Sequence, residues 1–219
     1  MLQFERQAWE QGVVRLAGVD EAGRGPLAGP VVAAAVVFER AFLEAEQHGL
    51  LRDVDDSKTL SESQRDALYA LLTERCPLVM GVGLADVAEI DSLNILRATH
   101  LAMARALNAL PALPERALVD GLPVSGLPCP SQAIVDGDAR SLIIAAASII
   151  AKVTRDRLMR ELDRQYPVYG FAQHKGYGTR AHMQALLQHG PCLAHRRSFR
   201  PVRDALGIRA AGGGVAGVG

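Results

Sequence analysis

The chain contains 219 residues with 24 basic and 24 acidic side chains. Its hydrophobic share of 49% excludes a disordered chain and predicts one soluble domain, and the aromatic share of only 5% predicts an aliphatic core. Its three cysteines are widely spaced and form no C-x-x-C pair, which argues against a disulfide framework or a zinc site and favours a reducing cytoplasm. The first residues lack the pattern of a signal peptide, and the apolar stretch Leu142 to Ala151 is about half of a membrane span, so we expect no membrane partner.

The first part of the chain carries the signals of two strands and a helix. Short strands rich in Val and Ala are expected over Leu16 to Asp20 and Val31 to Phe38, joined as a hairpin-like pair through the turn-forming segment Gly23 to Pro30. A surface helix should follow over Ser61 to Cys76, because Ser61 stands in the N-cap position and Gln64 completes a capping box.

Strands and helices alternate through the rest of the chain. Apolar runs bounded by Gly and Pro predict buried strands of a mixed sheet, and apolar stripes at helical spacing predict helices. The expected strands are Leu78 to Leu84, Ala117 to Asp120 and Ala133 to Val135, and the expected helices are Ser92 to Leu110, Ser141 to Gln165 and Thr179 to His189. The glycine-rich segment after Gly207 has no reason to fold.

The zero net charge hides an asymmetry along the chain. From Ile150 onward there are twelve Lys or Arg against four Asp or Glu, a balance of +8, so the preceding part carries −8. A basic C-terminal third next to an acidic remainder favours contact with a polyanion near a cation-binding acidic site. Solvated helix faces of either sign are the alternative explanation.

Four carboxylates stand at the ends of expected elements. Asp20 and Glu21 follow the first strand, Asp120 follows a later strand, and Asp138 precedes the long helix. Adjacent side chains of a strand point to opposite faces, so Asp20 and Glu21 can converge only if the strand ends there, and the glycines that follow permit such a bend.

Carboxylates gathered in this way predict a metal site. Without cations they would repel one another and raise each other's pKa, whereas Mg²⁺ or Mn²⁺ would relieve the repulsion. Two such ions roughly 4 Å apart activate a water and stabilise a leaving oxygen, which makes phosphodiester hydrolysis the expected reaction. The alternative for each Asp alone is the cap of a helix or turn.

The segment GRGPLAGP resembles a nucleotide-binding loop only at first sight. Pro26, Pro30 and the strand that follows are incompatible with a helix-opening dinucleotide loop. Gly23 and Gly25 instead permit close approach of a ligand, and Arg24 offers a charged donor to phosphate. The loop is therefore a candidate sensor of a 2′-hydroxyl group, with a simple tight turn as the alternative.

Several blocks of the sequence together resemble one family. They are AGVDEAGRGPLAGPVV, DDSKTLS, EIDSLNILRATHLAM, LVDG, GDARSLIIAAASIIAKVTRDRLM, YGFAQHKGYGT and HRRSFRPV. In this order, from about Ala17 to Leu206, the chain resembles bacterial ribonuclease HII, of the type 2 ribonuclease H family. The resemblance implies an α/β, ribonuclease H-like fold, in which a mixed central sheet is flanked by helices and followed by a C-terminal helical subdomain. The implied parts are a catalytic core over 1–165, a helical duplex-binding portion over 166–209 and a disordered tail over 210–219.

The resemblance also implies an activity. Members of the family hydrolyse the phosphodiester on the 5′ side of a ribonucleotide in RNA/DNA hybrids and in DNA duplexes with embedded ribonucleotides, leaving a 5′-phosphate and a 3′-hydroxyl, which implies a role in genome repair. By motif position the metal ligands would be Asp20, Glu21, Asp120 and Asp138. The RNA-to-DNA junction would be read by Gly23, Arg24, Gly25 and Tyr177.

Further residues lie in matching or basic blocks. Lys58, Asn94, Lys152 and Lys175 are expected phosphate or sugar contacts, unless they are ordinary surface residues. His174, His195, Arg196 and Arg197 lie in the basic third, where phosphate contacts would position a duplex. A general-base histidine is unnecessary where metal activates water. Ser148, one helical turn before Lys152, is expected mainly to pack the helix closely.

Two other functions share parts of this pattern. A junction resolvase or integrase-like nuclease would have the same carboxylates, but it would not need a loop and a tyrosine that sense a 2′-hydroxyl. A catalytically silent duplex-binding protein would face phosphates better without the acidic residues. We expect a monomer, and the glycine-rich tail contains no aromatic motif of the kind that docks on sliding clamps.

Overall fold

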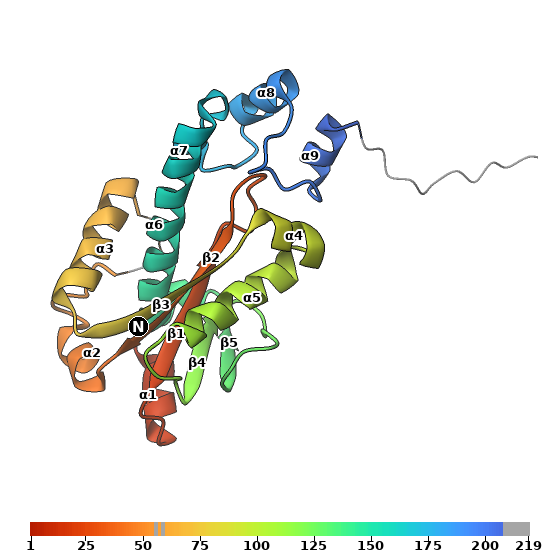
Figure 1. Ribbon diagram of the computed structural model, residues 1–219. Coiled ribbons are helices and arrows are strands. Elements are labelled where there is room, and N and C mark those ends of the chain that lie inside the picture. Colours follow the sequence, from red (N-terminus) through yellow and green to blue (C-terminus); the bar gives the residue numbers. More distant parts are fainter. Residues whose placement is uncertain (55–56, 58–59, 208–219) are drawn as a thin grey trace, which may run out of the picture.

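The computed structural model describes residues 1–54, 57 and 60–207, and the strands within these ranges form one mixed five-stranded sheet (Figure 1). The strands are β1 (Leu16–Ala22), β2 (Val31–Phe38), β3 (Leu78–Ala85), β4 (Arg116–Asp120) and β5 (Ser131–Ile134), in the order β3-β2-β1-β4-β5. β2 is antiparallel to β1 and β3, whereas β4 is parallel to β1 and β5. The expected α/β fold with a mixed central sheet is therefore confirmed.

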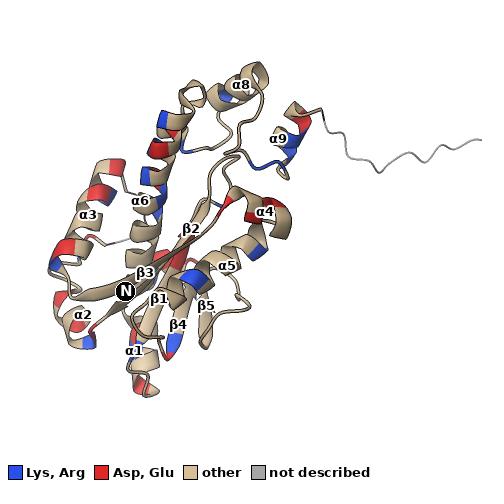
Figure 2. Ribbon diagram, viewed as in Figure 1, with Lys and Arg blue, Asp and Glu red and all other residues tan. Residues whose placement is uncertain are grey.

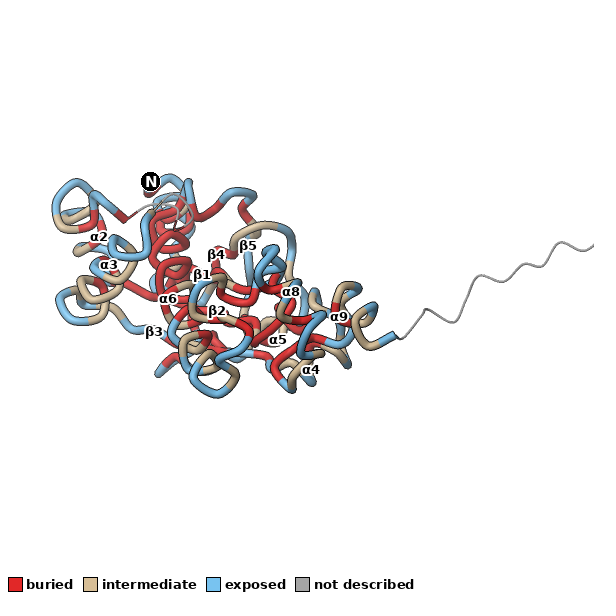
Figure 3. Tube along the Cα trace, turned by 90° about the horizontal axis from the view of Figure 1, so that it is seen from above, coloured by how far each residue is buried: buried red, intermediate tan, exposed pale blue. Residues whose placement is uncertain are grey.

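Helices cover both faces of this sheet. On one face α6 (Leu142–Gln165) crosses β1 and β2, with α3 (Glu62–Arg75) beside it, and on the other α5 (Ile95–Asn108) packs on β2 and β3 with α4 (Val87–Leu93) at its start. β2 is buried at every position because it serves both layers. Ala34 and Val36 belong to the α6 side, while Ala33 and Ala35 belong to the α5 side. Figure 3 shows the buried residues concentrated in the strands and in α6.

The approach of α6 to the sheet depends on one glycine. A Cβ built on Gly18 of β1 would lie 2.3 Å from the carbonyl carbon of Ile143 and 2.7 Å from the amide nitrogen of Ile144. Any larger residue would push the first turn of α6 away from the strand. Gly18 therefore sets the distance between β1 and the start of α6, where two of the expected metal ligands lie.

An N-terminal helix also holds the start of α6. Within α1 (Gln3–Glu10) the carboxylate of Glu5 is fully buried and accepts hydrogen bonds from Ser141 Oγ at 2.7 Å and from the amide of Ile143 at 3.2 Å. A carboxyl group at this position satisfies donors that the first turn of α6 leaves free. Burial raises the pKa of Glu5. The sequence before Leu16, which carried no recognisable signal, thus anchors the central helix.

The observed elements differ from the expected ones in several places. β1 continues to Ala22 instead of ending at Asp20, and α2 (Arg40–Glu46) was not anticipated. The helix expected to begin at Ser92 begins instead at Ile95 as α5, and Ser92 and Leu93 belong to the end of α4, because Asn94 adopts a φ of 71° that a right-handed helix cannot continue through. No helix in the described part of the chain is long and apolar enough to cross a membrane.

The C-terminal portion lies beyond the end of α6 (Figure 1). It consists of η2 (Pro167–Tyr169), α7 (Phe171–His174), α8 (Arg180–His189) and α9 (Arg200–Ala205). Asp91 of α4 fixes its far end by accepting hydrogen bonds from the amides of Arg197 and Ser198, both at 2.9 Å. A separate boundary at residue 165 stays a prediction, and the expected tail over 210–219 lies outside the described residues.

Three histidines form the centre of this portion. The ring of His174 stacks on that of His182, and Nδ1 of His182 lies 2.9 Å from the carbonyl oxygen of Tyr177, so this nitrogen must carry a proton. His195 Nδ1 accepts from the amide of Cys192 at 3.1 Å. The contact of 3.1 Å between the two Nε2 atoms then requires His195 to donate to His182. In each of His182 and His195 one ring nitrogen accepts a hydrogen bond, so both rings must be neutral to make this set of bonds.

We expect His182 and His195 to stay neutral at about pH 5.5, where a free histidine with a pKa near 6.5 is mostly protonated. Burial lowers the pKa of both, that of His195 from 6.5 to about 4. Because the unfolded chain binds the proton of His195 more readily, the contribution of neutral His195 to stability is complete above pH 6.5 and is lost as the pH falls towards 4. Long-range ¹H–¹⁵N correlation spectra should show the proton on Nδ1 of His182 and Nε2 of His195, with exposed His48 as internal comparison. Doubly protonated rings at that pH would contradict the assignment.

Candidate metal centre

Three carboxylates from separate elements meet at one edge of the sheet. Asp20 belongs to β1, Asp120 is the last residue of β4, and Asp138 lies in the short helix η1 (Gly137–Ala139) that precedes α6. One oxygen atom of each lies within 4.8 Å of the others. Because β1 and β4 are parallel neighbours, their C-terminal ends bring Asp20 and Asp120 to the same edge. Three of the four expected ligands are thus brought together, and we call them the acidic triad.

A glycine turn places two members of the acidic triad. The amide of Gly137 donates to Oδ1 of Asp120 at 2.7 Å, and Asp138 Oδ1 accepts from the amide of Ala139 at 3.1 Å. A Cβ on Gly137 would lie 2.8 Å from the side chain of Ile144 and 3.2 Å from that same Asp120 oxygen. A side chain at position 137 would displace the end of the Ile144 side chain and press on this Asp120 oxygen, whereas the Gly137 amide fixes the orientation of Asp120.

Burial gives Asp20 unusual electrostatics. Its side chain is only 3% exposed, and burial raises its pKa well above the ordinary value, with further increases from the charges of Glu21 and Asp120. Hydrogen bonds from the amide of Glu21, at 2.7 Å, and from Ser148 lower the pKa in part. The predicted mutual repulsion of the carboxylates is present, although burial is the larger cause.

This donor set fits a hard divalent cation. All three members of the acidic triad offer carboxylate oxygens, the ligands that Mg²⁺ and Mn²⁺ prefer, and no sulfur or imidazole belongs to the group. A buried carboxylate with a raised pKa gains most from a nearby positive charge. The acidic triad therefore provides a site at which a hydrated metal ion and a phosphate can meet.

Glu21 does not join the acidic triad. Since β1 continues to Ala22, the side chains of Asp20 and Glu21 alternate between the two faces of the sheet. Glu21 instead accepts from Nη1 of Arg24 at 3.2 Å. Burial raises the pKa of Glu21, while Arg24 lowers it and the charge of Asp120 raises it further. Its place as a fourth metal ligand stays a prediction.

The structure brings the Gly-Arg-Gly loop and Tyr177 together across 150 residues of sequence. Arg24 and Gly25 are exposed, whereas Gly23 is buried at a φ of 100° that favours glycine. A Cβ built on Gly25 would lie 3.6 Å from Cε1 of Tyr177, an ordinary contact distance. The tyrosine ring is 46% exposed beside the loop, so both are accessible to a ligand.

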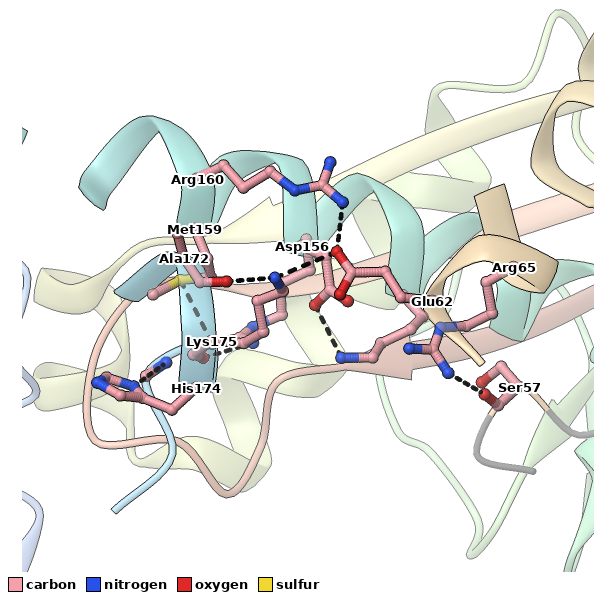
Figure 4. A network of polar contacts seen from close by, with 12 residues as sticks. Ser57, Glu62, Arg65, Asp156, Met159, Arg160, Ala172, His174 and Lys175 are labelled. Atoms are coloured by element: carbon pink, nitrogen blue, oxygen red, sulfur yellow. Dashed lines mark hydrogen bonds and ion pairs between the residues drawn. The ribbon is translucent and has the colours of Figure 1, made fainter. Parts of the chain in front are cut away.

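The other expected substrate contacts take varied positions. Lys175 Nζ bonds to Glu62 Oε1 at 3.3 Å within a polar network that joins α3, α6 and the segment after α7 (Figure 4). Lys152 Nζ pairs with Asp156 at 2.7 Å. Asn94 uses its side chain to cap α5 by accepting from the amides of residues 96 and 97, and Lys58 lies outside the described residues. Their roles toward a substrate stay predictions.

Two residues of the basic third are not phosphate contacts. Figure 2 shows basic residues on α6 and α9, but the side chains of Arg196 and His195 are only 0% and 1% exposed. A side chain sealed in this way cannot contact the phosphate of a duplex, so that expectation was wrong. Arg197 is exposed and keeps the expectation.

Ser148 does more than the sequence suggested. It is buried on α6, its Oγ lies 2.6 Å from Oγ of Ser57, and it makes a hydrogen bond to Asp20. The sequence favoured a small residue for close packing, which is only part of its role. The spacing of one turn from Lys152 was the available signal, but it did not point to Asp20.

Comparisons with known proteins agree with this geometry. A family model described as Ribonuclease HII matches residues 17–202. The chain is 54% identical over 205 residues to Ribonuclease HII of Chlamydia trachomatis serovar A, covering 93% of this chain and 90% of that one. It is 52% identical over 211 residues to Ribonuclease HII of Geobacillus thermodenitrificans, covering 95% and 77%. The crystal structure of the ribonuclease H2 from Pyrococcus horikoshii OT3 is similar with a TM-score of 0.71 at 32% identity, covering 87% of this chain and 96% of that one.

Replacing Asp20 by Asn should stabilise the metal-free protein at neutral pH and remove its affinity for Mg²⁺ or Mn²⁺. The fold raises the pKa of Asp20, so the loss of stability grows as the pH rises above the ordinary value of 3.8 and is complete above the raised pKa, whereas a neutral amide avoids this loss. The Tm should rise by about 2–4 °C for each kcal/mol relieved. Calorimetry in chelator and titration with Mn²⁺ measure the two effects.

Asp136→Asn is the matched control for this experiment. Asp136 is exposed in the turn between β5 and α6 that also carries Asp138, and its φ of 52° is one that Asn tolerates. It should leave both the Tm and the metal affinity close to those of the wild type. A lower Tm for Asp20→Asn than for Asp136→Asn would contradict the electrostatic destabilisation ascribed to ionised Asp20.

Proposed function

Because the chain belongs to the ribonuclease HII family, it is a metal-dependent endonuclease, and we propose that it hydrolyses the phosphodiester on the 5′ side of a ribonucleotide. The proposed substrates are RNA/DNA hybrids and DNA duplexes with embedded ribonucleotides, and the products carry a 5′-phosphate and a 3′-hydroxyl. The observation that carries the proposal is the acidic triad on the same molecule as an accessible Gly-Arg-Gly loop beside Tyr177.

In this proposal the protein holds its metal ligands ready before substrate binds. Asp20, Asp120 and Asp138 would hold the cations, with Glu21 as a fourth ligand. The amide of Gly137 orients Asp120, and Ser148 together with the amide of Glu21 orients Asp20. Two divalent cations, Mg²⁺ or Mn²⁺, would supply activation of the attacking water and positive charge for the leaving oxygen of an in-line displacement.

The exposed loop supplies the selection of substrate. Arg24 is a charge-assisted donor for a phosphate of the substrate, and the backbone of Gly25 permits close approach to a sugar. The exposed ring of Tyr177 offers an apolar face to the same sugar. A 2′-hydroxyl is the local difference between RNA and DNA, so contacts at this loop favour a ribonucleotide over a deoxyribonucleotide.

The proposal also covers partners and location. The partner is a nucleic-acid duplex, and exposed basic residues such as Arg197 are the phosphate contacts that would position it without reading its sequence. Lys58, Asn94, Lys152 and Lys175 are retained as further contacts in the proposal. Free Cys76, Cys129 and Cys192 fit the reducing cytoplasm, and a monomer suffices because one chain carries the whole acidic triad.

The direct test is cleavage of a labelled DNA duplex that carries one ribonucleotide, beside an all-DNA duplex of the same sequence. We expect a nick 5′ to the ribonucleotide in Mg²⁺ or Mn²⁺, no nick in chelator, and an intact all-DNA duplex. A polymerase should extend the new 3′-hydroxyl, and a ligase should accept the new 5′-phosphate. Cutting of both duplexes would indicate a DNA nuclease instead, and no cutting in either metal would leave only a binding role.

Within that assay, Asp120→Asn should lose nearly all activity. Removing a metal ligand costs several kcal/mol of transition-state stabilisation. A loss of about 3 kcal/mol lowers the rate by more than about a hundredfold. Binding of the duplex, followed by fluorescence anisotropy, should persist because the loop and basic residues remain. Asp136→Asn serves again as control and should cleave at close to the wild-type rate. Full activity of Asp120→Asn would remove Asp120 from the proposed site.

A further inference from the structure

Two arginines are sealed beneath the Gly-Arg-Gly loop. Arg155 comes from the middle of α6 and is 1% exposed, and Arg196 comes from the segment before α9 and is 0% exposed. They are the largest side chains buried to this extent among the described residues. A guanidinium group is rarely buried unless it is paired with a carboxylate, so their surroundings require an explanation.

Both guanidinium groups donate to main-chain carbonyl oxygens of one loop. Arg196 donates to Gly23 at 2.6 Å, to Arg24 at 3.0 Å and to Gly29 at 2.9 Å. Arg155 donates to the carbonyls of Ala28 and Pro30 and also, at 3.0 Å, to that of Lys175. Within the described residues neither forms an ion pair with a carboxylate. The arginines therefore hold the loop over 23–30 from inside and connect it to the segment that carries Tyr177.

The arrangement has an electrostatic cost. Burial lowers the pKa of Arg155 to about 10 and that of Arg196 to about 9, with the charge of Arg155 contributing to the second shift. Both values lie above neutral pH, so two positive charges remain under the loop. Removing charge from water is costly even where carbonyl dipoles offset part of the loss, and an apolar pair would fill the same volume more cheaply. A need to fix the loop explains the retention of two charges here.

Holding the carbonyls inward orients the opposite side of the loop. The peptide bonds are trans, so the N–H of each peptide unit points away from its C=O. Because the carbonyls of Gly23 and Arg24 point to Arg196, the amides of Arg24 and Gly25 point away from it. No acceptor for these two amides occurs within residues 1–54, 57 and 60–207. They are available to a ligand, and the ring of Tyr177 lies beside Gly25.

Gly23 makes this fit tight. A Cβ built on Gly23 would lie 2.0 Å from Nε of Arg155 and 2.4 Å from its Cδ. The loop backbone thus rests directly on the guanidinium stem, and the two surfaces determine each other's position. The same side chain reaches the carbonyl of Lys175, two residues before Tyr177.

We propose that Arg155 and Arg196 are positioning residues for ribonucleotide recognition, because they turn the amides of Arg24 and Gly25 outward and set the loop against Tyr177. This inference rests on the proposed function: the loop contacts the ribonucleotide, and the 2′-hydroxyl selectivity of these contacts depends on two buried arginines that never touch the substrate. The contribution is geometric. A lysine at either position keeps the positive charge but replaces the planar five-donor fork with a single ammonium, which cannot hold three carbonyls in the same directions.

The test compares Arg155→Lys and Arg196→Lys with Arg164→Lys, a matched control on α6 whose side chain is 74% exposed. Two quantities are measured and normalised to the folded fraction. They are kcat/KM on a duplex with one ribonucleotide, and Ki of an all-DNA duplex used as competitor. For the two buried positions kcat/KM should fall by about 100-fold, as expected when a contact shifts by about an ångström, while Ki stays within about threefold of the wild type. The control should change neither.

Three other outcomes of this kinetic comparison would each overturn one of the statements above. If kcat/KM stays at the wild-type level in folded Lys variants, the arginines only stabilise the fold. If kcat/KM and Ki worsen together, they support general duplex binding and not recognition of the ribonucleotide. If the wild type itself shows no preference for the ribonucleotide duplex, the proposed function fails before the inference is reached.

A measurement on the wild-type protein covers the case in which the variants do not fold. With ¹⁵N-labelled arginine, the Nε–H signals of Arg155 and Arg196 can be identified by their proximity to loop protons. Both should resist exchange with water, and in chelator both should shift on addition of the ribonucleotide duplex more than on addition of the all-DNA duplex. Equal responses to the two duplexes would overturn the proposal.

Discussion

The contact between α6 and β1 at Gly18 determines the geometry of the rest of the molecule. A side chain at this position would meet the backbone of Ile143 at 2.3 Å, so the helix lies directly on the strand. Asp138 just before the helix, Ser148 one and a half turns along it and Arg155 two turns further are thereby placed against β1 and the loop that follows. The start of one helix thus lies beside a member of the acidic triad, and the same helix carries the Ser148 hydroxyl that bonds to Asp20 and the Arg155 side chain that supports the loop.

The two ends of this arrangement carry opposite buried charge. The acidic triad contains Asp20, whose pKa is raised by burial first and then by neighbouring carboxylates, and the loop rests on two guanidinium groups that form no ion pair with a carboxylate among the described residues. Direct pairing would neutralise both, but the fold keeps them apart by binding each to main-chain groups. This separation leaves the acidic triad free to attract metal ions and the loop free to attract a phosphate group.

Local patterns in the sequence predicted all five strands, the longer helices and the three carboxylates that converge. Long apolar runs such as Val31 to Phe38 and the capping box at Ser61 depend on neighbouring residues, so they can be read without the fold. The division at Asn94 could have been read from its strong N-cap preference, but the apolar stripe on both sides concealed it. The burial of Arg196 could not be predicted from the sequence, because its nearest neighbours, His195 and Arg197, are basic and its hydrogen-bond partners lie over 160 residues away.

The loop shows why charge counted along a sequence is a poor guide to which arginine meets a ligand. Arg24 belongs to the short segment that Arg196 holds, yet the Arg24 side chain is 53% exposed and forms an ion pair with Glu21 at 3.2 Å. Because this guanidinium group is half exposed, a phosphate can approach it and compete with Glu21 for it. Arg196 has three carbonyl partners and no access to solvent, and releasing it would leave a buried charge unsatisfied. The fold therefore commits one arginine to holding the loop and leaves the other available on its surface.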